Sequence, residues 1–505
     1  MKKILYYTLT LLLGLFLCSG NCNPTSVIPD PDPDPEIPEI PEIPIFGGNV
    51  GPRANDADDP TNGIYVSPSG SDASGTGTKT SPYKSISFAL DKANPPATIL
   101  LLTGTYKEGH DIRVRKSNIT IKSAKGEWGV IDLTTYDSGH DQDSGIEFYQ
   151  KDDDTGDVVT NCTLQHLEIK GGFYAVNCET TWEWGVEYYP LRKGVSDIII
   201  EDCILHHTSN DVVKVKPGCK NITIRYNEIH HSGQEHISHP DFTKGERNAE
   251  GIDIVNGTNI HVHNNYIHDI CSTGVYAKGG STDAIIENNI IEHTYAAAIQ
   301  VGFDTSPQYF DLSVNPKYYE NINGIVRNNL TIDTGWEGIG LYASKDAQVY
   351  NNTVVNAVTY GTGKYHSPIY YGVATQDWAN PAGCPPNVNP NIHHNIVSQP
   401  SSYPGPIIEI RYIVDFPFDE GYPPGDLSGL EGNPTMNYNC YYVAGNNATF
   451  RDMRPPEADN MSLATWKTHV SGESNSIEVN PTLGTDYMPT NTQCTGMGIS
   501  VPLTK

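Results

Sequence analysis

Three acidic residues lie in two short segments whose side chains alternate between polar and apolar. Asp211 begins the segment Asp211–Lys216, and Glu250 and Asp253 lie in Glu250–Val255. Carboxylate oxygens are the ligands that Ca²⁺ prefers in proteins. We therefore predict that Asp211, Glu250 and Asp253 bind calcium, the one cofactor that the sequence indicates.

Two lysines accompany these acids. Lys214 lies in the first segment, and Lys278 ends the related segment Thr273–Lys278, directly before Gly279 and Gly280. Nearby cations can suppress the charge of a lysine and make it a base, and glycines without side chains would let a sugar come close. Lys214 and Lys278 are therefore the candidate catalytic bases.

This combination meets the needs of β-elimination on a uronate-containing polysaccharide. A bound cation, or a cluster of basic and amide groups, must neutralise the uronate carboxylate so that the adjacent C–H becomes acidic. A base must then remove that proton. The candidates for binding the substrate beside the two lysines are Tyr276, Gln300, Lys216 and Arg247.

A column of histidines precedes these segments. The column contains His207, His231, Asp269 and His293, and His206, His230 and His268 lie one residue earlier. His231 or His207 is a candidate catalytic residue. His231, His236 and His239 also offer zinc ligands, although histidines stacked at a turn often bond only to one another or to the backbone.

The apolar positions of five segments align them side by side. The aligned buried residues are Val213, Ile252, Val275, Ile299 and Ile339. Alternation then directs Lys214, Asp253, Tyr276 and Gln300 outward in one row, with Lys216 and Lys278 in the next. Strands lie ~5 Å apart, so these groups can act on one substrate. Such a row is also typical of a charge ladder that adds little to stability.

An asparagine recurs in one local pattern along the chain. It stands at Asn227, Asn265, Asn289, Asn329 and Asn352, with weaker repeats at Asn395 and Asn439. Positions 265 and 289 differ by 24 residues, and positions 329 and 352 by 23. A fixed period of this size predicts a solenoid, and alternating apolar residues around each asparagine make its elements strands. Extending the register places Cys203, His166 and Cys440 in the same column.

These patterns predict an all-β fold, a right-handed parallel β-helix over residues 47–505 with coils of about 22–24 residues, an Asn ladder and a short capping helix at 86–93. Three insertions are interpreted as loops, at 234–249, 303–323 and 359–391. The first two flank the row of Lys214 and would wall a groove. His261 and His263 share another outward face with Arg225, Glu287 and Arg327, where surface pairing is expected.

Both ends of the solenoid resemble known β-helix proteins. The quoted segments are Ile64–Asp72, Ser81–Ile86 and Ala97–Tyr106 near the start, and Trp466 with Ser476–Pro481 near the close. Across Gly63–Leu483 the chain resembles right-handed β-helix carbohydrate enzymes, including the family-9 polysaccharide lyases. That resemblance implies a polysaccharide lyase. The family's Asn-x-Asp-Asp-Gly-type calcium motif is replaced here by Ser209-Asn210-Asp211-Val212-Val213.

The first 46 residues predict export. Residues 1–22 have the charged start and apolar core of a signal peptide, and Cys18 or Cys22 is a candidate for a lipid anchor to an outer membrane. Residues 23–46 are rich in proline and acids and form an extended linker. We expect a bacterial-type protein that is extracellular, at the cell surface or periplasmic, and monomeric. Of its eight later cysteines, some are expected to pair in an oxidising compartment.

A formal net charge of −28 argues against nucleic acid as a partner. The expected partner is an acidic polysaccharide such as pectate or alginate. Three other functions fit the same residues. A glycoside hydrolase would use Asp253 with Glu250 or Glu337, a uronate epimerase shares the first step of the lyase, and a glycan-binding surface protein needs neither lysine.

Overall fold

The computed structural model describes residues 44, 47–137, 139–140, 142–151, 156–181, 193–233, 248–360, 366–375, 380–419 and 421–505. The predicted signal peptide and nearly all of the linker lie outside these residues. So do Arg247, His236 and His239, whose predicted roles remain predictions. Within the described residues, no helix is long and apolar enough to cross a membrane.

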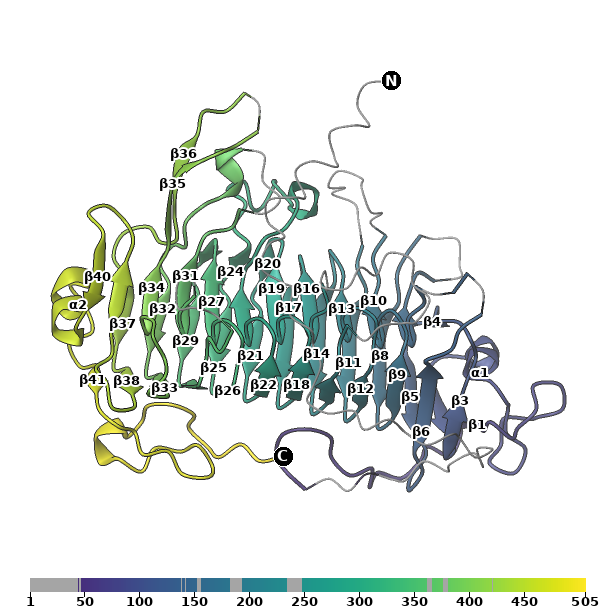
Figure 1. Cartoon of the computed structure of the whole chain (residues 1–505). Helices are drawn as coiled ribbons and strands as arrows, with labels where there is room; N and C mark the ends of the chain where they lie inside the picture. The colour runs from purple at the N-terminus through teal and green to yellow at the C-terminus, as the bar shows by residue number, and fades with distance from the viewer. Residues whose placement is uncertain are drawn as a thin grey trace, which may run out of the picture.

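The chain winds into a solenoid whose coils each contribute one strand to each of three sheets (Figure 1). The pairing between coils is parallel throughout the three stacks, apart from the antiparallel final pair β39–β40. The predicted fold class, an all-β right-handed parallel β-helix, is confirmed. The first sheet has 15 strands, and the second and third have 12 each.

The first sheet contains β1 (Ile64–Val66), β2 (Ala97–Leu101), β5 (Ile119–Ser123), β8 (Thr160–Gln165), β11 (Ser196–Glu201), β14 (Lys220–Arg225), β17 (Thr258–His263), β20 (Ser281–Thr282), β21 (Ile285–Glu287), β24 (Asn321–Ile322), β25 (Ile325–Arg327), β28 (Ser344–Lys345), β29 (Gln348–Tyr350), β32 (Asn391–His393) and β37 (Thr435–Asn437).

The second sheet, which carries the predicted site, contains β4 (Ile112–Val114), β7 (Ile146–Phe148), β10 (Val176–Cys178), β13 (Val213–Val215), β16 (Ile252–Val255), β19 (Val275–Lys278), β23 (Ile299–Val301), β27 (Ile339–Tyr342), β31 (Ile369–Gly372), β34 (Ile408–Ile410), β39 (Phe450–Asp452) and β40 (Ala458–Met461).

The third sheet contains β3 (Gly104–Tyr106), β6 (Gly129–Leu133), β9 (Glu168–Gly171), β12 (Ile204–His206), β15 (Glu228–His230), β18 (Tyr266–Ile270), β22 (Ile290–Thr294), β26 (Leu330–Ile332), β30 (Thr353–Val355), β33 (Ile396–Gln399), β38 (Cys440–Val443) and β41 (Ile477–Glu478). A hairpin of β35 (Tyr412–Phe416) and β36 (Gly425–Ser428) projects from the solenoid (Figure 1).

Helices cover both ends of the stack. At the start lies α1 (Ile86–Lys92), whose Ser85 accepts a hydrogen bond from the backbone of Phe88 and which buries Ile86, Ala89 and Leu90. Near the close lies α2 (Leu463–Val470), which buries Trp466. Because an uncovered final coil would expose unpaired strand edges, these helices protect the ends. The predicted capping helix is confirmed.

The predicted asparagine ladder runs through the buried bend between the first and third sheets. Each asparagine oxygen accepts the backbone N–H of the asparagine one coil earlier, at 3.0 Å from Asn227 to Asn265 and 2.9 Å from Asn265 to Asn289. The amide group of Asn289 donates to the carbonyl of Val262 at 3.0 Å and to Asn329 at 3.0 Å. The ladder therefore provides partners for the backbone N–H groups of the asparagines, which lie at the bends between strands.

Three residues were assigned to this column by extending the repeat, and only one of them lies in it. Cys203 joins the ladder, because its N–H donates to Asn227 at 3.0 Å. His166 instead aligns with Asp202, one residue earlier, and has a positive φ of 52°. Cys440 pairs with Ile396 and so follows the ladder residue Asn439. Both assignments were wrong because coils of unequal length shift a count made backwards or forwards from the regular repeats.

A third correction concerns the insertion at 359–391, which was interpreted wholly as a loop. It contains β31, a full strand of the second sheet that pairs with β27 and β34. Its Ile369 and Tyr371 are buried in the core. The prolines and glycines on either side of this short apolar run hid it. The segment 303–323 does leave the solenoid directly after β23 and returns at β24.

Residues 48–51, near the start of the described chain, meet the C-terminal tail along the outside of the third sheet. Tail residues cross several coils, with the N–H of Gly498 donating to His394 and that of Ile499 to Thr353. The backbone of Val50 then donates to Thr504 at 3.0 Å. This clasp, formed by residues 48–51 and 496–505, covers a separate apolar cluster that includes Val50, Leu330 and Leu503.

The cysteines of the described residues are all buried and none forms a disulfide. Cys440 and Cys494 are in contact, with 3.4 Å between their sulfur atoms. The expected pairing is therefore absent from the described residues.

Replacing the ladder residue Asn289 with alanine should lower the urea midpoint of unfolding, because it leaves the buried backbone N–H and side-chain amide of Asn265 without the oxygen that accepts from both. The expected loss is about 2 kcal/mol or more. The matched control is Asn391→Ala, which removes a half-buried strand asparagine outside the ladder. An equal shift in both variants would contradict a special role for the ladder.

Candidate functional site

The predicted register of the second sheet is confirmed. Lys214 pairs with Asp253, Asp253 with Tyr276, and Tyr276 with Gln300. The same outward position continues in both directions, which the sequence had not shown. We call the whole set the outer row: Arg113, Glu147, Asn177, Lys214, Asp253, Tyr276, Gln300, Gly340, Tyr370, Glu409 and Arg451.

The outer row points away from the coil interior but is largely covered. Asp253, Tyr276 and Gln300 have 1% or less of their surface exposed. Phe303, from the segment that follows β23, stacks over the Tyr276 ring with 6.1 Å between centroids. The row is therefore a polar layer beneath loops, and strand alternation alone could not reveal that cover.

The three predicted calcium ligands come together. Asp211, Glu250 and Asp253 each offer a carboxylate oxygen, and these oxygens lie within 4.8 Å of one another. Asp211 is held by the backbone N–H of Glu250 at 2.9 Å, and Glu250 by the hydroxyl of Ser272 at 2.9 Å. The register of β13 and β16 thus assembles residues from two coils into one acidic cluster.

This cluster fits a hard divalent cation. Its donors are all carboxylate oxygens, the set that Ca²⁺ takes. One oxygen of Glu250 and one of Asp253 are buried and have no hydrogen-bond partner. Orphaned buried acceptors of this kind call for a bound water or ion. Asp211, Glu250 and Asp253 are therefore the residues that would hold calcium.

Lys214 is the resident cation of the cluster. Its ammonium group donates to Asp211 at 3.1 Å and to Asp253, and its side chain is 16% exposed. Burial acts to lower the pKa of Lys214, but Asp211 and Asp253 outweigh it and hold the pKa well above its usual value. Burial, and then Asp211, raise the pKa of Glu250 well above its usual range.

Lys278 has a different setting. Its ammonium nitrogen lies 4.1 Å from the centroid of the Tyr276 ring and 3.4 Å from the carbonyl of Asp304. Among the described residues it forms no ion pair within 4.0 Å. Gly279 and Gly280 follow with positive φ values of 66° and 87°. The turn that ends β19 therefore presents Lys278 beside the acidic cluster, where its positive charge acts to lower the pKa of Glu250 and of Asp253.

Of the predicted substrate-binding residues, Gln300 and Lys216 already bond to other side chains, whereas the hydroxyl of Tyr276 does not. Gln300 accepts from Thr273 at 3.2 Å and donates to Glu337 at 2.9 Å. Lys216 is paired with Glu179. The hydroxyl of Tyr276 is buried without a hydrogen-bond partner. Their roles toward a substrate remain predictions.

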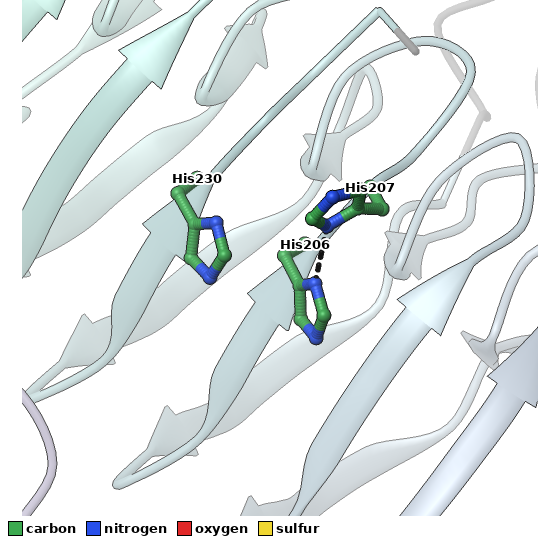
Figure 2. A group of neighbouring side chains, drawn as sticks. All are labelled: His206, His207 and His230. Carbon is green, nitrogen blue, oxygen red and sulfur yellow. Dashed lines mark hydrogen bonds between the residues drawn. The ribbon is translucent and has the colours of Figure 1, made fainter. Parts of the chain in front are cut away.

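The histidine column forms two stacks at the carboxyl ends of strands β12, β15 and β18 of the third sheet. His206, His230 and His268 are stacked 4.7–4.8 Å apart, as are His207 and His231 at 4.7 Å. Figure 2 shows three of these histidines, His206, His207 and His230. The Nδ1 atoms of His206 and His207 lie 2.5 Å apart, and those of His230 and His231 2.6 Å apart. Nitrogens this close share a hydrogen bond. The histidines of the column therefore bond to and stack on one another. The catalytic role of His231 remains a prediction.

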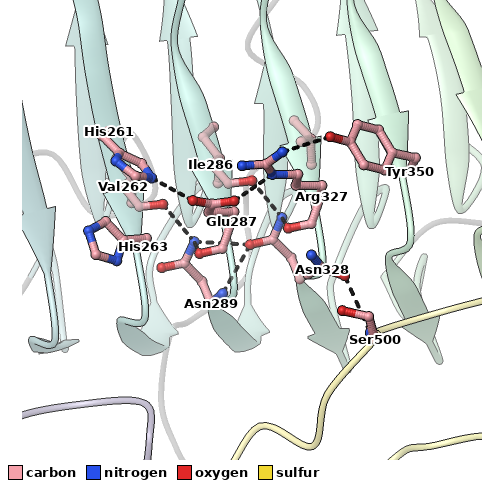
Figure 3. A network of polar contacts seen from close by, with 12 residues as sticks. His261, Val262, His263, Ile286, Glu287, Asn289, Arg327, Asn328, Tyr350 and Ser500 are labelled. Carbon is pink, nitrogen blue, oxygen red and sulfur yellow. Dashed lines mark hydrogen bonds and ion pairs between the residues drawn. The ribbon is translucent and has the colours of Figure 1, made fainter.

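The outward face of the first sheet carries a separate polar network (Figure 3). Glu287 accepts hydrogen bonds from His261 at 2.8 Å and from Arg327 at 2.5 Å, and Arg327 also donates to Tyr350 at 2.9 Å. Each of these contacts joins side chains of two neighbouring coils. The expected surface pairing is confirmed.

Removing Lys214 tests whether the cluster takes calcium. Lys214→Met leaves the buried carboxylates without their cation, so the melting temperature without calcium should fall, by an amount equivalent to up to about 3 kcal/mol. Calcium should then raise the melting temperature of the variant more than that of the wild type. The control Asp253→Asn should respond less than the wild type. Identical melting curves with calcium and with chelator in all three proteins would rule the site out.

The histidine stacks predict loss of stability in mild acid. Burial, and then His206, lower the pKa of His230 far below 6.5, and burial lowers that of His207 to about 4. As pH falls from about 6.5 to 4, these histidines become protonated in the unfolded chain but stay neutral in the folded protein. The free energy of unfolding therefore decreases. His230→Gln should make this dependence shallower by about one proton. Urea titrations across this range measure it, and an unchanged slope in His230→Gln would contradict the prediction.

Comparisons with known proteins agree with the architecture. Residues 117–403 match the family described as "Right handed beta helix region". No curated protein matches the chain. One similar solved structure is a pectate lyase, with 15% identity, a TM-score of 0.44, and coverage of 70% of this chain and 79% of that one.

Two further solved structures are similar at the same level. An alginate lyase from Paenibacillus sp. has 15% identity and a TM-score of 0.38, over 63% of this chain and 91% of that one. The A-module of a mannuronan C-5 epimerase from Azotobacter vinelandii has 13% identity and a TM-score of 0.42, over 68% and 85%. Identities this low carry no inference about activity. Because the family match spans more than half of the chain, the protein belongs to the right-handed β-helix family.

Proposed function

We propose that this protein is an exported polysaccharide lyase that cleaves a uronate-containing polymer, such as pectate or alginate, by β-elimination. The observation that carries the proposal is the position of Lys278. Its ammonium group has no acidic partner among the described residues, yet it lies over Tyr276, the outer-row neighbour of Asp253. A basic group placed beside a calcium-type carboxylate cluster is what this reaction requires.

The acidic cluster and Lys214 have complementary roles in this proposal. Calcium bound by Asp211, Glu250 and Asp253 would neutralise the uronate carboxylate. Lys214 holds Asp211 and Asp253 in place through its two contacts. Lys214 was also a candidate base, but its ammonium group is already shared by two carboxylates, so Lys278 is the better candidate.

Lys278 would remove the proton from the carbon next to the uronate carboxylate. The electron pair of that C–H bond forms a new C=C bond, and the glycosidic oxygen on the neighbouring carbon leaves with its sugar chain. The ammonium group of Lys278 packs on the rings of Tyr276 and Phe303, which position it beside the acidic cluster.

The positions of the carboxylates leave fewer residue pairs that could act in the hydrolase alternative. Glu337 is fixed by Gln300, Tyr342 and His366 and precedes β27, three strands from Asp253. Its carboxylate is thereby held beside Gln300, two strand steps from Asp253, and is already bonded to three side chains. Asp253 with Glu250, which have carboxylate oxygens within 4.8 Å of each other, is therefore the better pair for a hydrolase.

The decisive test follows ultraviolet absorbance while the purified fragment 47–505 meets polygalacturonate or alginate, each with calcium and with chelator. A rise reports the new C=C bond. Lys278→Ala should lower kcat by about 10²–10⁴, while Lys220→Ala, an exposed lysine of the first sheet, should have no effect.

Other outcomes point to the alternatives. New reducing ends without absorbance would indicate hydrolysis, and a changed uronate stereochemistry without cleavage would indicate epimerisation. Binding of polymer without any turnover, unchanged in Lys278→Ala, would indicate a glycan-binding protein and contradict the proposal.

A further inference from the structure

The outward side of the third sheet changes from polar to apolar along the solenoid. One outward row runs from β15 to β38 and alternates with side chains that point into the core. Paired from strand to strand, the row consists of Glu228, Tyr266, Ile290, Leu330, Thr353, Ile396 and Cys440. Apolar side chains on an outer face are stabilised by a cover that removes them from water, and here the C-terminal tail provides it.

Two apolar clusters hold the tail on this row. The first is the cluster under the clasp. The second lies nearer the end of the stack and joins Ile396 and Cys440 of the row to Cys494 and Met497 of the tail. A cysteine of the tail is therefore set against a cysteine of the sheet.

The tail is a single layer of chain at Cys494. This residue ends the short helix η4 (Thr492–Cys494) and is 0% exposed, whereas Gln493 and Thr495 on either side of it are exposed. The outer side of the tail therefore faces solvent. Chain ends open locally at a smaller free-energy cost than the unfolding of a domain, and lifting the tail would expose both cysteines at once.

The two thiol groups are already in contact. Their sulfur atoms lie 3.4 Å apart, and the Cys494 thiol donates to the sulfur of Cys440. The Cys440 thiol in turn donates to the carbonyl of Val479 at 3.4 Å. A disulfide needs a sulfur–sulfur distance of about 2.0 Å, so the two atoms have only about 1.4 Å to close. A small movement of the tail can supply that distance.

We propose that Cys440 and Cys494 form a redox site, at which a low-molecular-weight disulfide joins the two cysteines and so fastens the tail to β38. No oxidant has to enter the closed structure, because the exchange starts on the tail while it is lifted. The two positions are 54 residues apart in the chain, so the bond closes a large loop and restricts the lifted state. This proposal is independent of the proposed function.

The exchange balances with oxidised glutathione as the oxidant. Burial raises the pKa of the Cys440 thiol and of the Cys494 thiol, so both stay protonated and unreactive while the tail is docked. With the tail lifted, the Cys494 thiolate attacks oxidised glutathione, forms a mixed disulfide and releases one glutathione. As the tail returns, the Cys440 thiolate attacks the Cys494 sulfur and releases the second. The two cysteines are oxidised, one disulfide replaces another, and their protons end on the two reduced glutathione molecules.

Thiol counting tests the bond directly. The fragment 47–505, which contains all eight described cysteines, is incubated with oxidised glutathione, then denatured and alkylated with iodoacetamide. Six of the eight cysteines should be alkylated, and all eight after reduction. Peptide mapping should find the peptides of Cys440 and Cys494 joined. Eight alkylated cysteines without reduction, or a bond between other cysteines, would overturn the proposal.

Two variants check the assignment. Cys494→Ala should keep all of its remaining cysteines open to alkylation after the same treatment. The matched control is Cys384→Ala, which removes a buried cysteine of another apolar cluster and should still lose two alkylatable thiols. The map of the wild type decides the outcome if either variant fails to fold.

Hydrogen exchange tests whether the bond fastens the tail. The backbone N–H groups of Gly498 and Ile499 donate to His394 and Thr353 and exchange only when the tail lifts. Their exchange should be at least about tenfold slower in the oxidised than in the reduced protein, while that of Ile121 on β5 should be unchanged. Equal exchange of Gly498 and Ile499 in both forms would overturn the fastening. Neither measurement involves a polysaccharide, so failure of the proposed function would leave both results intact.

Discussion

The hydrogen bonds between coils are the constraint on which everything else depends. Side chains in a strand alternate between two faces, so a slip of one residue between coils would turn Lys214 and Asp253 into the core and Val213 and Ile252 out of it. The buried asparagines prevent that slip, because each one bonds to the backbone of the coil before it. The ladder is remote from the site, yet it sets the register that brings Asp211, Glu250 and Asp253 together.

Burial and charge oppose each other along the outer row. Carboxyl groups in the row and in the acidic cluster beside it are removed from water, which raises the pKa values of Glu250 and Asp253. Lys214 offsets part of that charge, but one oxygen of Glu250 and one of Asp253 have no hydrogen-bond partner. A fold that only needed stability would replace such groups with apolar residues. Their concentration in one layer, next to a lysine with no ion pair among the described residues, favours a chemical rather than a structural reason for them.

The repeat and the alternation made the fold and the centre of the row predictable. Asparagine spacing gave the solenoid, and the pattern of Val213 and Ile252 gave the register of Lys214 with Asp253. Prediction failed where coils vary in length: His166 and Cys440 were misplaced by one residue, and β31 was taken for loop. Glu409 and Arg451 were missed because insertions separate their three-residue strands from the regular repeats. The cover over Asp253 depends on contacts distant in sequence, such as Phe303 over Tyr276, which no local pattern encodes.

The clasp formed by residues 48–51 and 496–505 has a mechanical consequence. Val50 and Gly51 bond to Thr504 and Asn264, so the chain is fastened to the flank of the middle coils before it reaches β1 at the end of the stack (Figure 1). A force applied at residue 47 would load the hydrogen bonds of residues 48–51 together, in shear, and would not peel away the first coil. The terminal coils, with α1 and α2 over them, would be spared that load.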